Sequence, residues 1–311
     1  MDAAATPTGA SPSSTAAVAA PRGRDAPATR TDAARQAEAG LDEIARLLSA
    51  GGAAVLTGAG LSTESGIPDY RGETGRRRRG SPMTYQEFTA AEENRRRYWA
   101  RSFLGWPAIT AARPNAGHRA VARLAAAGLV TGVVTQNVDG LHLAAGTSDA
   151  VELHGSLHHV LCLDCGTSSP RTRLQHRLRA ANPDFAEVAA HVNADGDAEL
   201  PEAAVAGFRT AACEACGTGT LKPDVVFFGE TVPPQRVARC YELVDAAPAL
   251  LVLGSSLTVM SGLRFVRHAA RRGKPVAVVN QGATRGDGLA SALVNLPLGA
   301  ALTELAARSG A

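Results

Sequence analysis

Short apolar runs, each followed by glycine or polar residues, are the feature that most constrains the fold of this chain. They lie at 53–57, 129–134, 225–228, 250–253 and 275–279. Runs of this length are typical of parallel strands that are buried on both faces, and stretches with a helical pattern, at 115–127 and 262–272, lie between them. The sequence therefore predicts an α/β fold with a doubly wound parallel sheet, which is Rossmann-like and suited to binding a dinucleotide.

Two segments interrupt this pattern and predict a smaller, inserted domain. A helical insertion at 76–107 carries large aromatic residues, and a module at 161–222 lacks the strand pattern but contains two cysteine pairs. We expect these two segments to form the smaller domain together. The Rossmann-like domain then consists of the remaining segments, 32–75, 108–160 and 223–311.

Residues 1–31 are expected to be a disordered tail. Ala, Pro, Thr, Ser and Gly dominate this segment, and it has no apolar periodicity that could offset the entropy lost on ordering. An organelle transit peptide is the alternative, but Asp2, Asp25 and Asp32 argue against it.

The composition excludes several classes of protein. The 311 residues are 45% hydrophobic and 20% charged, which is close to the average for globular proteins. No apolar run approaches the roughly 18 residues needed to cross a bilayer, and a net charge of +3 offers no broad positive field for nucleic acid. We therefore expect neither membrane spanning nor direct nucleic-acid binding. Five cysteines are too few for a disulfide scaffold, which favours a reducing compartment, with the cytoplasm as the default.

Four of the five cysteines form two C-x-x-C pairs, Cys162 with Cys165 and Cys213 with Cys216. Two such pairs supply the four thiolates of a tetrahedral zinc site that leaves no position open for water. The sequence therefore predicts one structural zinc ion. Unrelated buried cysteines or a redox pair are the alternatives.

A glycine-containing segment follows the first predicted strand. Gly58-Ala59-Gly60 resembles the start of a dinucleotide-binding loop, in which glycine lets backbone N–H groups approach a pyrophosphate. Ser62 and Thr63 add hydroxyl donors, but Thr63 occupies the position of the third glycine of the usual motif. A hydride-transferring enzyme therefore fits poorly, and a tight turn without a ligand is the alternative.

Amide and carboxylate side chains follow the second predicted strand, at Gln136, Asn137 and Asp139. A buried polar group without a partner costs about 1–3 kcal/mol, and a polar ligand would relieve that cost. His154 is a candidate general base, because an unperturbed imidazole titrates near pH ~6.5. A histidine with an ordinary structural role is the alternative.

Taken in their order along the chain, several of these segments resemble the sirtuin family, the NAD-dependent protein lysine deacylases. The resemblance covers roughly residues 35–311, and the wording IPDYRG at 67–72 and RYWARSFLGWP at 97–107 is similar to the class II branch. The matching segments are the two cysteine pairs together with 58–72, 135–142, 152–155, 222–230, 254–257 and 279–282.

The resemblance implies that NAD is a co-substrate bound by the loops that follow the strands. Asn137 and Asp139 would serve catalysis in the nicotinamide pocket, with His154 as the base. The implied NAD-binding residues are Gly58, Ala59, Gly60, Ser62, Thr63, Asp69, Tyr70, Arg71, Gln136, Asn137, Val138, Asp139, Gly254, Ser255, Ser256, Asn280, Gln281, Gly282 and Leu298.

The family's chemistry follows from the same resemblance. The acyl oxygen of a substrate lysine attacks C1′ of the nicotinamide ribose, and His154 later takes a proton from a ribose hydroxyl. Lysine and O-acyl-ADP-ribose are released. The implied partners are proteins with acylated lysines, whose extended chain would gain main-chain hydrogen bonds along an edge. The residues expected at that edge are Val225, Val226, Phe227 and Phe228, and a purely buried strand is the alternative.

Tyr98 and Arg101 have helical spacing and so share a face. The pair resembles the residues that recognise acidic acyl groups in desuccinylating sirtuins, which leads to the hypothesis of a preference for a negatively charged or branched acyl chain. A tyrosine in the core beside a surface arginine is the alternative. The run from Arg76 to Arg79 is interpreted as a solvated loop or, alternatively, as a contact for an anionic partner.

Two other functions remain open. A protein mono-ADP-ribosyltransferase would use the same activated ribose but transfer it to a protein nucleophile. A non-catalytic zinc-ribbon module would lack a base or a nicotinamide pocket, whereas His154, Asn137 and Asp139 are all present.

Overall fold

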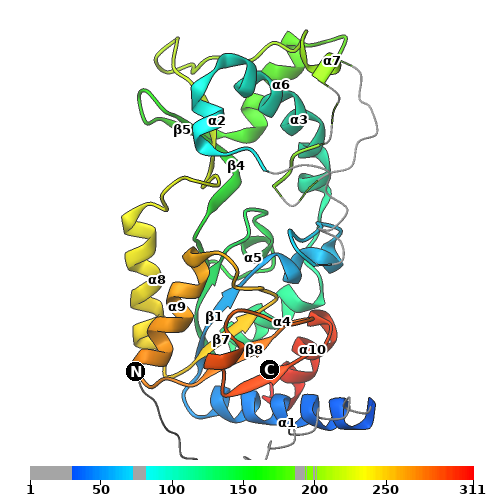
Figure 1. Cartoon of the computed structure of the whole chain (residues 1–311), viewed down its shortest axis with the longest axis vertical. Coiled ribbons are helices and arrows are strands. Elements are labelled where there is room, and N and C mark those ends of the chain that lie inside the picture. The colour runs from blue at the N-terminus through cyan, green and yellow to red at the C-terminus, as the bar shows by residue number, and fades with distance from the viewer. Residues whose placement is uncertain (1–29, 73–81, 186–192, 194, 199, 201) are drawn as a thin grey trace, which may run out of the picture.

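The computed structural model describes residues 30–72, 82–185, 193, 195–198, 200 and 202–311. The tail predicted at 1–31 lies almost wholly outside the described residues, and so does the run from Arg76 to Arg79. Two parts stand one above the other in Figure 1, a larger part with a parallel sheet and a smaller part with a second sheet.

A six-stranded parallel sheet forms the centre of the larger part. Its strands are β1 (Ala53–Thr57), β2 (Val130–Thr135), β3 (Val151–Glu152), β7 (Leu250–Leu253), β8 (Val276–Val279) and β9 (Ala292–Val294). Their order is β3-β2-β1-β7-β8-β9, and every neighbouring pair is parallel. This arrangement confirms the predicted doubly wound, Rossmann-like sheet.

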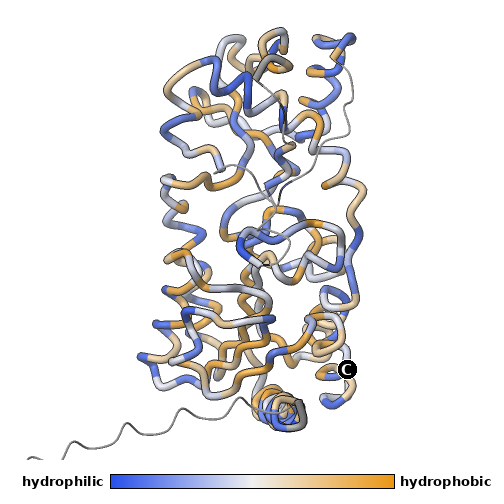
Figure 2. The backbone as a smooth tube through the Cα atoms, turned by 45° about the vertical axis from the view of Figure 1, so that its right-hand side comes forward, coloured by the Kyte–Doolittle hydropathy of each residue, from blue (hydrophilic) through white to orange (hydrophobic). Residues whose placement is uncertain are grey.

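Helices cover both faces of this sheet, because the strands are apolar on both sides. Val55 and Leu251 pack with the helices of one face, whereas Leu56 and Val252 pack with those of the other. This alternation is the ordinary consequence of side chains pointing to opposite faces along a strand. Figure 2 shows much of the backbone inside this part in the hydrophobic colour. The first face carries α1 (Arg30–Ser49), α4 (Ala116–Ala126) and α10 (Leu298–Arg308), and the second carries α8 (Pro234–Ala246) and α9 (Met260–Arg271).

The smaller part combines helices with an antiparallel sheet of order β5-β4-β6. Its aromatic anchors Phe88, Trp99 and Phe103 are at most 3% exposed and pack in one core cluster with residues of the sheet. Its elements are α2 (Tyr85–Ala90), α3 (Glu92–Ala111), β4 (Gly155–Cys162), β5 (Ser168–Pro170), α6 (Arg171–Ala181), α7 (Glu202–Val205) and β6 (Leu221–Val225).

The prediction that 225–228 is a strand of the parallel sheet is wrong. The strand of this region, β6, ends at Val225 and pairs antiparallel with β4 of the smaller sheet. The apolar residues that follow β6 line a cavity rather than a sheet core. An apolar run indicates that a segment is buried, but it does not indicate which element packs against it. The sequence pattern therefore assigned this segment to the wrong sheet.

The remaining short elements are η1 (Ala59–Ser65), α5 (Leu141–Ala144) and η3 (Asp287–Leu289). Within the described part of the chain, no helix has both the length and the apolar character that a bilayer crossing requires.

Candidate active site

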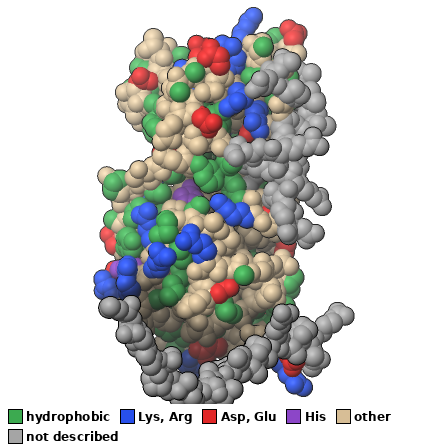
Figure 3. All heavy atoms as spheres, in the orientation of Figure 1, with side chains coloured by type: hydrophobic (Ala, Val, Ile, Leu, Met, Phe, Trp, Pro, Cys, Tyr) green, Lys and Arg blue, Asp and Glu red, His purple; other side chains and the backbone are tan. Residues whose placement is uncertain are grey.

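A cavity of about 730 Å³ lies where the two parts meet. Its walls come from the loops after β1, β2, β7 and β8 on one side, and from α3 and the segment 225–232 on the other. Figure 3 shows hydrophobic side chains and a histidine at the waist between the two parts. Ligands of doubly wound sheets bind beyond the carboxyl ends of the strands, which is where this cavity lies.

The loops after β1 and β7 pack against each other where the strand order reverses. The backbone N–H of Gly60 donates to the carbonyl oxygen of Gly254 over 2.9 Å. A Cβ atom at Gly58 or Gly60 would lie 2.8 Å from that same oxygen, which is too close. Glycine is therefore required at both positions, and the backbone of this loop is open to the cavity.

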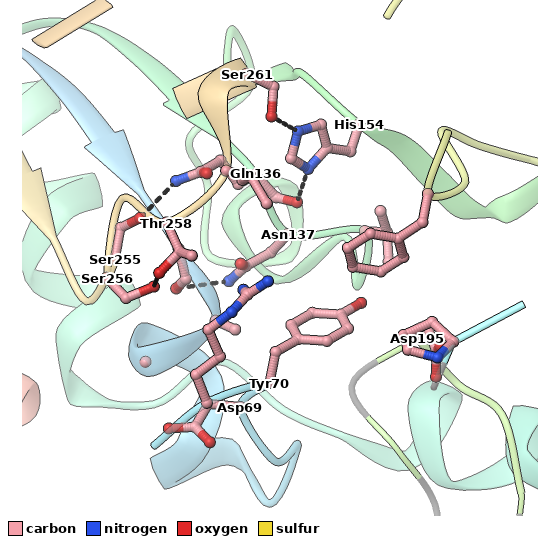
Figure 4. Close-up of a pocket in the computed structure, with 18 of the residues that line it drawn as sticks. Asp69, Tyr70, Gln136, Asn137, His154, Asp195, Ser255, Ser256, Thr258 and Ser261 are labelled. Atoms are coloured by element: carbon pink, nitrogen blue, oxygen red, sulfur yellow. Dashed lines mark hydrogen bonds between the residues drawn. The ribbon is translucent and has the colours of Figure 1, made fainter. Parts of the chain in front are cut away.

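Amide and hydroxyl groups line the wall formed by the loops after β2, β7 and β8 (Figure 4). Nε2 of Gln136 donates to Oγ of Ser255 over 2.8 Å, which ties the loop after β2 to the loop after β7. The hydroxyls of Ser256 and Thr258 are 3.0 Å apart, and Nδ2 of Asn280 donates to the carbonyl oxygen of Gly282 over 2.9 Å. This wall offers hydrogen-bonding groups of the kind that contact a nucleoside.

Asn137 lines the cavity, and its side-chain amide is fixed by the buried residue Ser62, which is itself bonded to the buried Asp139. Its Nδ2 donates to Oγ of Ser62 over 3.0 Å and to the carbonyl oxygen of Gly58 over 3.1 Å. Ser62 in turn donates to Oδ2 of Asp139 over 2.7 Å. Ser62 and Asp139 are 1% and 6% exposed and do not line the cavity. They therefore orient Asn137 rather than reach the cavity themselves.

His154 lines the cavity and is hydrogen-bonded at both ring nitrogens. Nδ1 lies 2.9 Å from the carbonyl oxygen of Gln136, and Nε2 lies 2.8 Å from Oγ of Ser261 (Figure 4). A carbonyl oxygen can only accept, so Nδ1 carries the proton and Nε2 keeps its lone pair. Burial lowers the pKa of His154 below its ordinary value of 6.5, and the charges of Arg236 and Arg264 lower it further against the raising effect of the Gln136 bond. The ring is neutral at pH 7 and can act as a base at Nε2.

An ion pair between a buried lysine and a partly exposed glutamate shapes the wall contributed by the segment after β6. Nζ of Lys222 lies 3.0 Å from Oε2 of Glu230 and donates to the carbonyl oxygen of Val225 over 2.6 Å. The same carboxylate oxygen accepts from the backbone N–H of Phe227 over 2.8 Å. These bonds fix the path of the backbone along the cavity wall. Phe228, which lies in the same segment, is 38% exposed.

Tyr98 and Arg101, which both lie on α3, have different positions relative to the cavity. Tyr98 is 6% exposed and lines the cavity, where burial and the charges of Asp195 and Asp197 raise the pKa of its hydroxyl. Arg101 does not line the cavity, because its Nε lies 2.9 Å from Oδ1 of Asp197 and 2.8 Å from the carbonyl oxygen of Ala198.

The four cysteines of the two C-x-x-C pairs come together at the end of β4. Their Sγ atoms lie within 4.8 Å of one another, and the distances from Cys162 to Cys216 and from Cys165 to Cys213 are both 3.8 Å. Tetrahedral zinc with Zn–S bonds of about 2.3 Å requires sulfurs about 3.8 Å apart. The donor set and its spacing fit a structural zinc ion.

Most of the residues expected to bind NAD or substrate meet in the one cavity. Those that line it are Gly58, Ala59, Gly60, Thr63, Asp69, Tyr70, Arg71, Tyr98, Gln136, Asn137, Val138, His154, Val225, Val226, Phe227, Phe228, Gly254, Ser255, Ser256, Asn280, Gln281, Gly282 and Leu298. Ser62, Asp139 and Arg101 lie behind its walls.

Several lining residues were missed by the sequence analysis, among them Asp195, Asp197, Glu230, Ser261 and Arg264. The two aspartates come from the smaller part and carry no recognisable spacing signal. Ser261 lies in the first turn of α9, and only the fold brings it to His154.

Comparison with known proteins gives a consistent result. The Sir2 family model matches residues 58–261. The NAD-dependent protein deacetylase 1 of Streptomyces coelicolor is 62% identical over 288 residues, which cover 93% of each chain. A protein of the same description from Mycobacterium avium is 50% identical over 258 residues, which cover 81% of this chain and 90% of the relative.

Solved structures agree with these relatives. A structure described as "Structural Basis for the Mechanism and Regulation of Sir2 Enzymes" has a TM-score of 0.68 at 28% identity and covers 88% of this chain and 98% of its own. Another, described as "Sir2-p53 peptide-NAD+", has a TM-score of 0.67 at 28% identity, with coverages of 86% and 96%. The chain therefore belongs to the Sir2 family.

Proposed function

We propose that the protein is an NAD-dependent protein lysine deacylase, with deacetylation as its default activity. The reaction converts an acyl-lysine, NAD and water into lysine, nicotinamide and O-acyl-ADP-ribose. The family membership and the names of the relatives support this activity. The partners are proteins with acylated lysines.

One observation carries the proposal. A neutral histidine, His154, shares a single cavity with the glycine loop after β1 and with the polar loops after β7 and β8. The base and the expected nucleotide-binding groups thus face the same space.

The loops after β1, β7 and β8 are suited to hold NAD, which supplies the ribose that receives the acyl group. Gly58 and Gly60 line the cavity with backbone that a pyrophosphate can approach, and Ser255, Ser256 and Asn280 offer hydrogen bonds to the adenosine half. Asn137, oriented by Ser62 and Asp139, lines the position expected for the carboxamide of nicotinamide.

His154 is the residue to which we assign the proton transfer. Its Nε2 lone pair accepts the proton of a ribose hydroxyl, which makes that oxygen nucleophilic toward the acyl carbon. The bond from Nδ1 to Gln136 fixes the ring, and imidazolium formed during transfer keeps that acceptor.

The segment after β6 is suited to receive the substrate chain. Val225 and Val226 line the cavity, and Lys222 holds their backbone in place through its ion pair with Glu230 and its bond to the carbonyl oxygen of Val225. A peptide that pairs with such a backbone gains affinity with little demand on its sequence.

The experiment that tests the function is mass spectrometry of an acetyl-lysine peptide incubated with NAD and the protein. We expect free lysine peptide, nicotinamide and O-acetyl-ADP-ribose, all lost in His154→Ala but retained in His159→Ala, which alters an exposed histidine of β4. ADP-ribosylated protein with no free lysine would instead indicate a mono-ADP-ribosyltransferase. Folded protein that consumes no NAD would indicate a non-catalytic module.

Three finer assignments belong to the same proposal. The wording around Tyr70 and Trp99 supports membership of the class II branch, and the two C-x-x-C pairs support a reducing, cytoplasmic location. A third is the division of the chain into a Rossmann-like domain and a smaller domain made from 76–107 and 161–222. The two separate sheets support it, although β4 begins at Gly155 and already belongs to the smaller sheet.

A further inference from the structure

A turn of the smaller part, residues 193 and 195–198, is docked tightly on α3. The backbone N–H of Gly196 donates to the carbonyl oxygen of Asn193 over 2.9 Å, and the N–H of Ala198 donates to that of Arg101 over 3.2 Å. A Cβ atom at Gly105 of α3 would lie 2.2 Å from the carbonyl oxygen of Gly196, so glycine is what allows this approach. The position of the turn is therefore set by α3.

The docked turn brings two carboxylates into the cavity. Asp195 and Asp197 both line it together with Tyr98, and Asp197 is only 5% exposed. In Figure 4, Asp195 lies across the pocket from Ser255, on the far side of the Tyr70 ring. The aspartates thus mark the end of the cavity away from the expected nucleotide site, which we call the α3 end.

Two cations near the α3 end, Arg101 and Arg171, do not line the cavity. Arg101 is bound through Nε to Oδ1 of Asp197 at 2.9 Å, and the two side chains are 22% and 8% exposed. Arg171 is buried between Trp99 and Trp106, with its guanidinium carbon 5.3 and 5.1 Å from their ring centroids, and it does not line the cavity.

In the described part of the chain, the arginines that line the cavity are Arg71, which follows η1, and Arg264 of α9. Among the described residues, the ionisable side chains of α3 and its docked turn that line the α3 end are therefore Tyr98 and the two aspartates. The charged side chains that α3 and its docked turn present to this end of the cavity are therefore acidic.

Resting on the proposed function, we propose that Asp197 and Asp195 set the acyl specificity of this site. Asp197 holds Arg101 out of the cavity, and the carboxylates repel an acyl chain that ends in a negative charge. The substrate class is lysine with a neutral acyl group, and a terminal amide or hydroxyl can donate to the carboxylates. This assignment opposes the preference for an acidic acyl chain that Tyr98 and Arg101 suggested from sequence.

A pair of matched peptides tests the proposal. One carries succinyl-lysine and the other carries its terminal amide, succinamoyl-lysine, so the two differ in charge but hardly in size. Their dissociation constants are measured by fluorescence anisotropy with the full chain, and acetyl-lysine turnover with NAD is measured in parallel. We expect the amide to bind about tenfold more tightly or better, which corresponds to about 1.4 kcal/mol.

Asp197→Asn keeps the shape of the side chain but removes its charge and releases Arg101. We expect it to shift the ratio of the two constants toward the carboxylate by about tenfold or more, the effect of gaining a charge-assisted hydrogen bond. Adding Arg101→Gln should cancel that gain. Asp245→Asn is the matched control, because Asp245 pairs with His268 on the surface of the larger part. Circular dichroism establishes that each variant is folded.

Three results would overturn the proposal. The wild type could bind the carboxylate as tightly as the amide, Asp197→Asn could leave the ratio unchanged, or neither long acyl peptide could bind while the acetyl peptide does. Absence of acetyl-lysine turnover in the folded wild type would instead contradict the proposed function, whatever the binding ratio.

Discussion

The hydroxyl of Ser62 donates to Oδ2 of Asp139 over 2.7 Å, although the two residues are 77 positions apart in the sequence. The same hydroxyl accepts from Nδ2 of Asn137, and Oδ1 of Asp139 accepts from the backbone N–H of Leu141 over 2.9 Å. The carboxylate thus anchors the loop after β2 and, through one hydroxyl, orients the amide that faces the cavity.

Ser62→Ala should therefore impair both stability and the expected nicotinamide pocket. Two buried polar groups, on Asp139 and Asn137, lose a partner, so we expect a loss of about 1–3 kcal/mol in the free energy of unfolding and a raised KM for NAD. Urea denaturation and initial rates measure the two effects. Ser65→Ala is the control, because the buried Ser65 hydroxyl has no hydrogen-bond partner among the described residues. Equal effects of both substitutions would contradict this role.

The pH dependence of activity should report His154. Because its pKa is lowered by burial, the neutral base persists below pH 6.5, the ordinary value for histidine. We expect kcat/KM to stay level from pH 8 to about 6.5 and to fall only at lower pH, where protonation removes the Nε2 lone pair. A rate profile on an acetyl-lysine peptide checks this, and an acid-side midpoint above 6.5 would refute it.

Glu152 should make the protein less stable as the pH rises through neutrality. Burial raises its pKa from 4.5 to about 7, partly offset by Ser156, and its Oε1 has no hydrogen-bond partner among the described residues. A raised carboxyl pKa favours the folded state fully below pH 4.5, and that contribution is lost as the pH passes 7. The loss is at most about 3 kcal/mol, since one pKa unit is about 1.36 kcal/mol.

Glu152→Gln isolates this effect. We expect the variant to unfold at higher urea concentration than the wild type at pH 8 and to lose that advantage near pH 4.5. Glu242→Gln, which changes an exposed partner of Arg239, should follow the wild type at both pH values. A Glu152→Gln advantage that does not change with pH would show that the carboxyl does not titrate in this range.

Removal of zinc should unfold the smaller part. The four thiolates join β4 to the segment before β6, so their release frees both ends of a long chain segment. We expect zinc chelation, or the substitution Cys216→Ser, to lower the melting temperature. Either change should also abolish the binding of one equivalent of zinc per chain, as measured by elemental mass spectrometry. Cys240→Ala, which alters a buried thiol of α8, should keep the zinc. Unchanged melting after proven zinc removal would exclude a structural role.

The parallel sheet could be predicted because its central strands are apolar on both faces, as at Val55 and Leu56. Strands β3 and β9 escaped prediction because two or three residues carry no periodic signal. The run at 225–228 was misplaced because its apolar side chains face a cavity. Burial was evident from the sequence, but the identity of the covering element depends on contacts that are distant along the chain.

The same distinction separates the site residues that could be predicted from those that could not. Residues that follow a strand directly, such as Asn137 and Ser255, could be predicted because strand ends of a parallel sheet share one edge. Ser261 and Asp197 could not, because only tertiary packing brings them to His154 and Arg101. The helical spacing of Tyr98 and Arg101 also led to a predicted acyl-binding role for Arg101. Spacing on one helix does not reveal that the side chain has a partner in another segment.

The contact of Gly58 and Gly60 with Gly254 has a consequence for anyone who wishes to transplant this nucleotide loop. The three glycines leave no room for a side chain between them, so the two loops form one interlocked unit. In a chimera that receives residues 58–62 without 254–256, the grafted loop would face a segment whose shape does not fit it. The chimera should lose its affinity for dinucleotide even though every grafted residue is native.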